Sequence, residues 1–211
     1  MAGRGTRIVL ASSSPRRREL LEALGVAFEV LPPAVDEQPL PSEEPAAFTL
    51  RAAQEKAKAA WRRLDMADGR PVLIIAADTV VVREGHILGK PADAAEAVCM
   101  LRSLAGREHA VITGVYLLLL GNGRTAREEL YAIRTAVWFR ELDEGEIRSY
   151  VSTGEAMDKA GAYAAQGIGC SLIRRVEGSY TNVVGLPLAE VAESLKRFGI
   201  PLFTGRDPVS G

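Results

Sequence analysis

The sequence predicts an α/β domain with a mixed central sheet flanked by helices. Short apolar segments alternate with amphipathic ones through the first half, which favours strands joined by helical crossovers. The tripeptide Gly121-Asn122-Gly123 separates two longer strand-like segments, as a hairpin turn does. Parallel and antiparallel pairing are therefore both expected. No stretch of the 211 residues has the composition of a linker between independent domains, so we expect a single domain over 1–211.

The N-terminal third predicts two strands, two helices and a loop. Pro15 opens the first helix, because proline suits the first helical turn, and Gly25 ends it. Five prolines among acidic residues predict an extended loop before the second helix, which is alanine-rich and amphipathic. The expected elements are strands at 7–11 and 28–31, a helix from Pro15 to Gly25, a loop at 32–45 and a helix at 46–64.

The rest of the chain predicts further strands and helices around the hairpin. The most apolar strand directly precedes Asp78, and a glycine-rich segment lies between the last two helices. The expected elements are strands at 72–77 with 80–82, 110–120 and 130–139, helices at 93–104, 144–151 and 187–198, and the glycine-rich segment at 163–176.

Composition limits the possible partners and setting. With 26 Lys and Arg against 27 Asp and Glu, the formal charge is −1, which argues against a broad nucleic-acid surface. The longest apolar runs, 72–77 and 115–120, fall far short of the ~20 residues of a membrane span. The apolar stretch that ends at Ala11 is too short for a signal peptide. Two cysteines, Cys99 and Cys170, form no disulfide framework, which favours a reducing compartment. From the charge, the apolar runs and the cysteines together, we expect a cytoplasmic protein without membrane or nucleic-acid partners.

The first candidate site is the run Ser12-Ser13-Ser14-Pro15-Arg16-Arg17-Arg18. A strand enters a serine turn and then a helix N-terminus, whose free N–H groups suit phosphate. Arginines in a first helical turn oppose the helix dipole, and a bound anion would reverse that cost. The alternative is that Ser14 simply caps the helix and the arginines are solvated.

The second candidate is Asp78-Thr79, after the most apolar strand. Ligands of open α/β sheets gather beyond the carboxyl ends of strands. A carboxylate placed there must be paired, hydrogen-bonded or bound to a metal. Asp78 is therefore a metal ligand or a general base, or alternatively a turn residue that caps the strand.

Two further segments carry groups suited to a nucleotide. Lys90 in Gly89-Lys90-Pro91 can hold a phosphate as a point charge, although such tripeptides are commonly surface turns. The segment from Asp158 to Gly169 mixes small and polar residues as a cavity wall does, or as a tight structural turn does. Within it, Gln166 offers a donor and an acceptor that suit the edge of a uracil or thymine ring.

Other residues are assigned structural roles. His86 and His109 show no metal-ligand spacing and are expected to be surface or satisfied core residues. Cys99 falls in a helical apolar pattern and is expected in the core. No nucleophile signature is present, and the two Gly-x-Gly segments match no dinucleotide or P-loop fingerprint.

Together these segments resemble the Maf family of nucleoside triphosphate pyrophosphatases. They follow the family's order from about residue 7 to residue 198. The matching stretches are Leu10-Ala11-Ser12-Ser13-Ser14-Pro15-Arg16-Arg17, Glu55-Lys56-Ala57, Ala76-Ala77-Asp78-Thr79-Val80-Val81, Gly89-Lys90-Pro91, Asp158-Lys159-Ala160-Gly161-Ala162-Tyr163, Gly178-Ser179-Tyr180 and Val184-Gly185-Leu186-Pro187-Leu188.

The resemblance implies two lobes around a deep groove, as in the inosine triphosphate pyrophosphatases. It implies hydrolysis of a nucleoside triphosphate to monophosphate and pyrophosphate with a divalent cation, Mg²⁺ or Mn²⁺. The residues Arg16, Thr79 and Gln166 resemble those of the subgroup that hydrolyses dTTP and UTP. The implied site residues are Asp78, Lys90 and Glu37 for catalysis, Glu37 and Asp78 for the metal, and Ser12, Arg16, Arg17, Lys56, Thr79, Asp158, Lys159 and Gln166 for substrate.

The expected function is thus a hydrolase of phosphorus-containing anhydrides that could also remove non-standard pyrimidine nucleotides. The family suggests a possible homodimer. One alternative is a nucleotide-binding regulatory protein linked to septum formation. Another is a pyrophosphatase with a different base specificity.

Overall fold

A seven-stranded mixed sheet forms the centre of the computed structural model, which describes residues 5–35 and 38–204. The strands are β1 (Arg7–Ala11), β2 (Glu29–Val30), β3 (Val72–Arg83), β4 (His86–Leu88), β5 (Glu108–Gly121), β6 (Arg124–Phe139) and β7 (Ile173–Glu177). The helices are α1 (Pro15–Glu22), α2 (Pro45–Trp61), α3 (Ala94–Leu104), α4 (Glu144–Ser152), α5 (Tyr180–Val184) and α6 (Leu188–Arg197), with 3₁₀ turns η1 (Ala160–Ala162) and η2 (Gly167–Leu172).

The sheet combines a parallel half and an antiparallel half in the order β2-β1-β3-β5-β6-β7. Strand β1 runs parallel to β2 and β3, whereas β3, β5, β6 and β7 pair antiparallel. Strand β4 folds back on the end of β3 through a tight turn. The expected mixed sheet is therefore confirmed, and β3 is the strand at which the two halves join.

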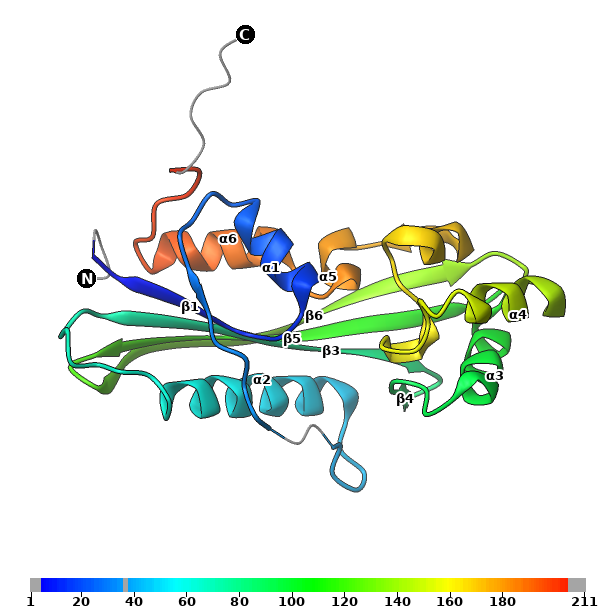
Figure 1. The fold of residues 1–211 in the computed structure, drawn as a ribbon, viewed down its shortest axis with the longest axis horizontal. Coiled ribbons are helices and arrows are strands. Elements are labelled where there is room, and N and C mark those ends of the chain that lie inside the picture. Colours follow the sequence, from blue (N-terminus) through cyan, green and yellow to red (C-terminus); the bar gives the residue numbers. More distant parts are fainter. Residues whose placement is uncertain (1–4, 36–37, 205–211) are drawn as a thin grey trace, which may run out of the picture.

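Helices cover the sheet as its side-chain alternation requires. Along β3, Leu73 and Ile75 pack on the side of α1 and α6, whereas Ile74 and Ala76 pack on the side of α2. Figure 1 shows α2 on one face of the sheet and α1 and α6 on the other. Helices α3 and α4 lie at the end of the sheet near β4, away from α6. A separate apolar cluster joins α3 and α4 to that end, so the sheet carries two lobes.

A glycine lets α2 approach the sheet closely. A Cβ atom at Gly114 of β5 would lie 2.4 Å from the backbone of Thr49 in α2. Any side chain at residue 114 would therefore push α2 away from the sheet. This contact fixes where α2 places the residues farther along it, including Lys56.

The expected helices and main strands are confirmed, with several differences. Strands β4 and β7 and the short helix α5 were not expected, because they are short and lack a clear period. Strand β6 starts at Arg124 rather than residue 130, because β5 pairs with its charged first half. The prediction for Cys99 is wrong, since Cys99 is exposed on α3.

Asp78 lies inside a strand rather than at its end. Strand β3 continues through Asp78 to Arg83, paired with β5 residue by residue from Val72 to Val82. Pairing with β5 satisfies the backbone N–H and C=O groups of this stretch, so the strand continues past the polar side chain of Asp78. Among the residues that the structure describes, no helix has the length and apolar character needed to cross a membrane.

His109 is a buried base that should make stability depend on pH. Its Nε2 lies 2.8 Å from the Tyr163 hydroxyl, and its ring packs edge-on against Phe139 and Tyr163. Burial lowers the pKa of His109 to about 4. As pH falls below about 6.5, the unfolded chain binds a proton that the folded chain refuses, so stability is lost between pH 6.5 and 4.

We predict that lowering the pH from 7 to 5 reduces the free energy of unfolding by about 2 kcal/mol through His109. Urea unfolding at both pH values should show this loss, and His109→Gln should remove most of it. His86→Gln, at an exposed histidine, is the matched control and should leave the pH dependence unchanged. An equal pH dependence in His109→Gln and in the unmodified protein would contradict the assignment.

Candidate active site

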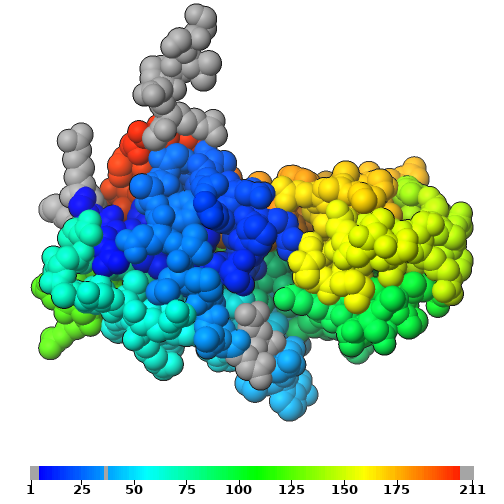
Figure 2. All heavy atoms as spheres, viewed as in Figure 1, coloured from blue at the N-terminus to red at the C-terminus, as the bar shows by residue number. Residues whose placement is uncertain are grey.

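A cavity opens where β1 ends and β3 continues. Ala11, the last residue of β1, pairs with Ala76, and β4 joins the same edge of β3 only from Val81. The stretch of β3 between them is bordered by the serine turn that leads into α1. A cavity of about 280 Å³ lies there. In Figure 2 the N-terminal segment (blue) and the segment after α4 (yellow) face each other near the middle of the molecule.

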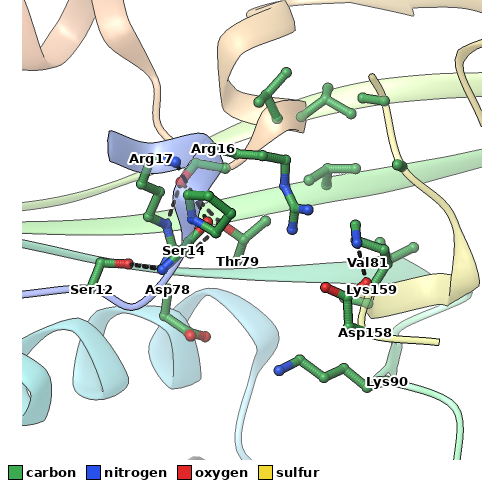
Figure 3. A pocket seen from close by; sticks show the side chains of 18 of the residues that line it. Ser12, Ser14, Arg16, Arg17, Asp78, Thr79, Val81, Lys90, Asp158 and Lys159 are labelled. Atoms are coloured by element: carbon green, nitrogen blue, oxygen red, sulfur yellow. Dashed lines mark hydrogen bonds and ion pairs between the residues drawn. The ribbon is translucent and has the colours of Figure 1, made fainter. Parts of the chain in front are cut away.

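The cavity gathers most of the predicted site residues. Arg16, Lys90 and Lys159 direct their cationic ends into one space, with the carboxylate of Asp78 beside it (Figure 3). These side chains come from segments far apart in the sequence. The predicted residues that line the cavity are Ser12, Arg16, Arg17, Lys56, Asp78, Thr79, Lys90, Asp158 and Lys159.

The serine turn is organised by its own hydroxyls. Ser14 caps α1, and its side chain accepts a hydrogen bond from the Arg17 backbone N–H. The cap named in the alternative interpretation is therefore present, but Arg17 is buried rather than solvated. The Ser12 hydroxyl accepts from the Ser14 N–H at 3.1 Å. Two first-turn arginines then take different places: Arg16 reaches into the cavity, whereas the side chain of Arg17 is buried.

Arg17 links three segments that form the cavity floor. Its Nε donates to the Gly185 carbonyl at 2.8 Å, and its terminal nitrogens donate to Thr79 Oγ1 at 3.0 Å and Ser12 Oγ at 3.5 Å. A planar guanidinium with several fixed donors suits such bracing. Arg17 therefore holds β3 and the turn before α6 in register with the serine turn.

Asp78 forms a buried ion pair with Lys56 from α2. The distance from Lys56 Nζ to Asp78 Oδ1 is 2.6 Å, and the side chains are only 5% and 8% exposed. Lys56 also donates to the Ala77 carbonyl at 3.4 Å. A charge removed from water needs such a partner, because desolvation costs several kcal/mol per ion. The ion pair thus fixes the position of the Asp78 carboxylate at the cavity wall.

A chain of buried hydroxyls supports Thr79 from behind. Thr79 Oγ1 lies 2.9 Å from Thr113 Oγ1 on β5, and Thr113 donates to the Asn182 carbonyl at 3.2 Å. The Asn182 amide then donates to the Val111 carbonyl and to Thr135 Oγ1. These bonds tie β3, β5, β6 and α5 together, which makes the wall behind Thr79 rigid.

The opposite wall joins two predicted motifs through their backbones. The N–H of Gly161 donates to the Gly89 carbonyl at 3.0 Å, next to Lys90. Gly161 has φ +67°, and a Cβ there would lie 2.9 Å from the Val81 side chain. Glycine is therefore required for this approach, which brings Lys90 beside Asp158 and Lys159.

Asp158 stays ionised among cations. It pairs with Lys159, and Lys159 and Arg16 hold the pKa of Asp158 below its ordinary value. Over the described residues, five cationic side chains and two carboxylates line the cavity. The cations outnumber the carboxylates, so the site suits a ligand with several negative charges.

Two predicted residues stand apart from this set. Gln166 is partly exposed and does not line the cavity, although its neighbours Ala164 and Ala165 do. Glu37 lies outside the described residues, so its predicted catalytic and metal-binding roles stay predictions. Sequence analysis missed Glu155 and Tyr150, which hold the loop around Gln166; only the two glycines of Gly167-Ile168-Gly169 hinted at a close backbone approach.

The carboxylates present fit a metal that arrives with a polyphosphate. The described residues contain no group of three or more His, Cys, Asp or Glu side chains placed to hold a metal ion. Mg²⁺ usually keeps several waters and binds through one or two carboxylates plus substrate phosphates. Asp78, at the cavity wall, is a donor of that kind.

The fold and the site define an α/β protein with a cavity at the end of strand β1 that is lined mainly by cationic side chains among its charged residues. Comparison with known proteins then gives the family: residues 7–198 match the model described as Maf-like protein, and the chain belongs to that family.

Several relatives and one solved structure are similar to the chain. A protein of Geobacter sp. (strain M21) named dTTP/UTP pyrophosphatase is 48% identical over 91% of this chain and 95% of its own. One of the same name from Anaeromyxobacter sp. (strain Fw109-5) is 53% identical over 93% and 91%. The structure of a HAM1 protein from Coxiella burnetii shares the fold, with a TM-score of 0.53 and 15% identity over 91% of this chain and 99% of that one.

We predict that Lys56→Met destabilises the protein by about 3–5 kcal/mol, because it leaves the Asp78 carboxylate buried without the Lys56 ammonium. The double variant Lys56→Met/Asp78→Leu should recover most of the loss, since both charges are gone. Urea unfolding measures all three proteins. Arg102→Met breaks an exposed pair with Glu144 and should hardly change stability. If Lys56→Met behaved like Arg102→Met, the buried pair would not have the importance assigned to it.

Proposed function

We propose that this protein hydrolyses nucleoside triphosphates, preferentially dTTP and UTP, to the monophosphate and pyrophosphate. The observation that supports this best is the shared cavity of Arg16, Lys90, Lys159 and the buried pair Lys56–Asp78. A triphosphate needs cations around it, and a hydrolase needs a carboxylate beside them. Relatives about 50% identical over most of the chain bear the name dTTP/UTP pyrophosphatase.

The lining of the cavity supports one orientation of the nucleotide. Apart from Lys56 on α2, the cationic side chains come from α1, from the segment after β4 and from the segment before η1. Most of the apolar lining comes from β5, from α5 and from the loop after η1, namely Val111, Val183, Val184, Tyr163, Ala164 and Ala165. Four further apolar residues line the cavity from other segments, namely Pro15, Pro33, Val81 and Ala160. The phosphates would lie among the cations, and the base would lie against the apolar wall, next to Gln166.

Within this orientation each polar residue receives a role. Arg16, Lys90 and Lys159 would bind phosphate oxygens, and Ser12 would add a hydroxyl. Arg17 and Thr79 would keep the floor of the site in place through the hydrogen bonds described above. Gln166, which follows Ala165 and lies outside the cavity lining, would have to turn its side chain toward the cavity to present its amide to the pyrimidine edge.

Asp78 would act on the attacking water. The water oxygen forms a bond to the α-phosphorus, the bond from that phosphorus to the oxygen bridging the α- and β-phosphates breaks, and Asp78 takes up the water proton. Lys56 would keep the carboxylate oriented through the 2.6 Å contact. Pyrophosphate would leave with its charge balanced by Lys90 and Arg16.

A divalent cation, Mg²⁺ or Mn²⁺, fits this scheme. Asp78 and Glu37 would hold it together with substrate phosphates. When bound, it would polarise the phosphate oxygens and lower the pKa of a coordinated water. Metal removal by a chelator is therefore expected to stop hydrolysis.

The setting follows from the same proposal. We place the reaction in the cytoplasm, where nucleoside triphosphates are made, and treat residues 1–211 as one domain. Non-standard pyrimidine nucleotides fit the same chemistry, because only the base end of the site would differ. A homodimer is compatible with this proposal and is tested by sedimentation.

The test of this function is pyrophosphate release. The purified protein is incubated with dTTP, UTP, dCTP, dGTP and dATP at equal concentration, with Mg²⁺ or with Mn²⁺. Release from dTTP and UTP above the others is the expected result. Preferential release from another nucleotide would contradict the proposed specificity for dTTP and UTP and identify a different one. Binding without any release would favour a regulatory nucleotide-binding protein.

We predict that Asp78→Asn lowers kcat for dTTP by at least roughly 100-fold, because an amide does not accept the water proton. Steady-state pyrophosphate release measures it. Asp93→Asn makes the same chemical change at the exposed cap of α3, where asparagine also caps, and should retain full activity. Near-normal turnover in Asp78→Asn would refute the role.

We predict that Arg16→Ala weakens binding of all nucleoside triphosphates by a similar factor, on the order of tenfold, because it removes a charge-assisted bond to phosphate and leaves the base end intact. Binding of dTTP, dGTP and inorganic tripolyphosphate is measured by calorimetry. The matched control is Arg18→Ala, two residues on and paired with Glu22 at the surface, which should bind normally. A loss confined to one base would contradict this placement.

A further inference from the structure

The loop between η1 and β7 is held by the carboxylate of Glu155, which the proposed reaction does not use. Glu155 Oε1 accepts a hydrogen bond from the Ile168 N–H at 3.0 Å, and Oε2 accepts one from the Gly169 N–H at 2.7 Å. The Tyr150 hydroxyl donates to Oε2 as well, at 2.8 Å. Each carboxylate oxygen therefore has at least one donor, and together they fix the start of η2.

Two glycines make room for the Glu155 carboxylate and for the Tyr150 hydroxyl that donates to it. Gly167 has φ +71°, and a Cβ there would lie 2.2 Å from Glu155 Oε1. A Cβ at Gly169 would lie 2.6 Å from the Tyr150 hydroxyl oxygen. In the Gly167-Ile168-Gly169 segment, the first glycine therefore leaves space for the Glu155 carboxylate, and the second leaves space for the Tyr150 hydroxyl and the Ala164 backbone.

The same hydrogen bonds reach the cavity wall. The Tyr150 hydroxyl oxygen accepts from the Ala164 N–H at 3.2 Å, and the Tyr180 hydroxyl donates to the Ala165 carbonyl at 3.0 Å. Burial, with Glu155 as a second cause, raises the pKa of Tyr150, so its hydroxyl keeps the proton that it donates. Ala164 and Ala165 line the cavity, and Gln166 follows them. The path from Glu155 to the wall is therefore two hydrogen bonds long.

We propose that Glu155 is a positioning residue for base selectivity: it fixes the wall against which the pyrimidine ring lies, without touching the substrate. This rests on the proposed function, which puts the base at that wall. Ala164 and Ala165 carry side chains too small to adjust to a base, so the fit depends on where their backbone is held. A displaced wall would admit a purine more easily and hold a pyrimidine less well, whereas the phosphates, bound by Arg16, Lys90 and Lys159, would be unaffected.

The test compares binding of inorganic tripolyphosphate and of the α,β-methylene analogues of dTTP and dGTP by calorimetry. In these analogues a carbon replaces the oxygen that bridges the α- and β-phosphates, so the proposed reaction cannot consume them. Glu155→Gln replaces one accepting oxygen by an NH₂ group, which cannot accept from a backbone N–H. We expect the preference for dTTP over dGTP to fall about tenfold, the size of one charge-assisted hydrogen bond, with tripolyphosphate affinity unchanged.

Two more variants separate positioning from general damage. Gly167→Ala should give the same loss of preference, because its methyl group occupies the seat of Glu155. Tyr150→Phe keeps the Glu155 carboxylate but removes the hydrogen bond to Ala164, so it should reduce the preference for dTTP over dGTP to a lesser degree. This variant also tests the inference if Glu155→Gln does not fold. Glu177→Gln, at an exposed glutamate on β7, is the control and should bind normally.

The outcomes are distinct. Loss of preference with tripolyphosphate binding intact supports the inference. Equal weakening of all three ligands, or an unchanged preference, overturns it while pyrophosphate release by the unmodified protein still supports the proposed function. If the unmodified protein binds nucleotides with a preference that Glu155→Gln abolishes but releases no pyrophosphate, the inference stands and hydrolysis fails. Absence of any nucleotide binding overturns both.

Discussion

The buried contact between Lys56 and Asp78 constrains the rest of the structure. Two charges with side chains 5% and 8% exposed are tolerable only if they meet, and they meet only if α2 lies close against β3 and β5. The absence of a side chain at Gly114 allows that closeness. The apolar residues of α2, such as Ala53 and Ala57, then pack against the sheet in the buried cluster on that face. The catalytic proposal thus depends on helix packing as much as on the residues in the cavity.

Two walls of different chemical character line the cavity. One wall is charged. Its long, flexible side chains, such as those of Arg16 and Lys90, extend into the cavity and can adjust to the position of a polyphosphate. The other wall is backbone and small apolar side chains, held by Glu155, Tyr150 and Tyr180. In the proposed orientation of the nucleotide, separate groups would therefore govern the affinity for phosphate and the choice of base, so substitutions at the two walls should have different effects.

Sequence reasoning succeeded where a local signal exists. Periodicity and turn residues located the helices and long strands, and motif order located every charged side chain among the described residues that line the cavity, including Lys56 and Lys159. It failed where long-range pairing decides: Asp78 lies mid-strand because β5 pairs with it, and the charged start of β6 is a strand for the same reason. Glu155 was missed because a lone glutamate has no pattern, and its partners are backbone N–H groups reached only after folding. The exposed side of Cys99 on α3 was likewise hidden, because one helical position cannot be oriented without its neighbours.

The long ladder of β3 and β5 has a mechanical consequence. It runs unbroken from Val72–Leu120 to Val82–Ala110, and it belongs to both lobes. A rotation of one lobe against the other would therefore have to bend or twist this ladder, because the same paired strands continue from one lobe into the other. The segments at the cavity rim lie outside the ladder, so we expect the movements that admit nucleotide and release product to be concentrated there.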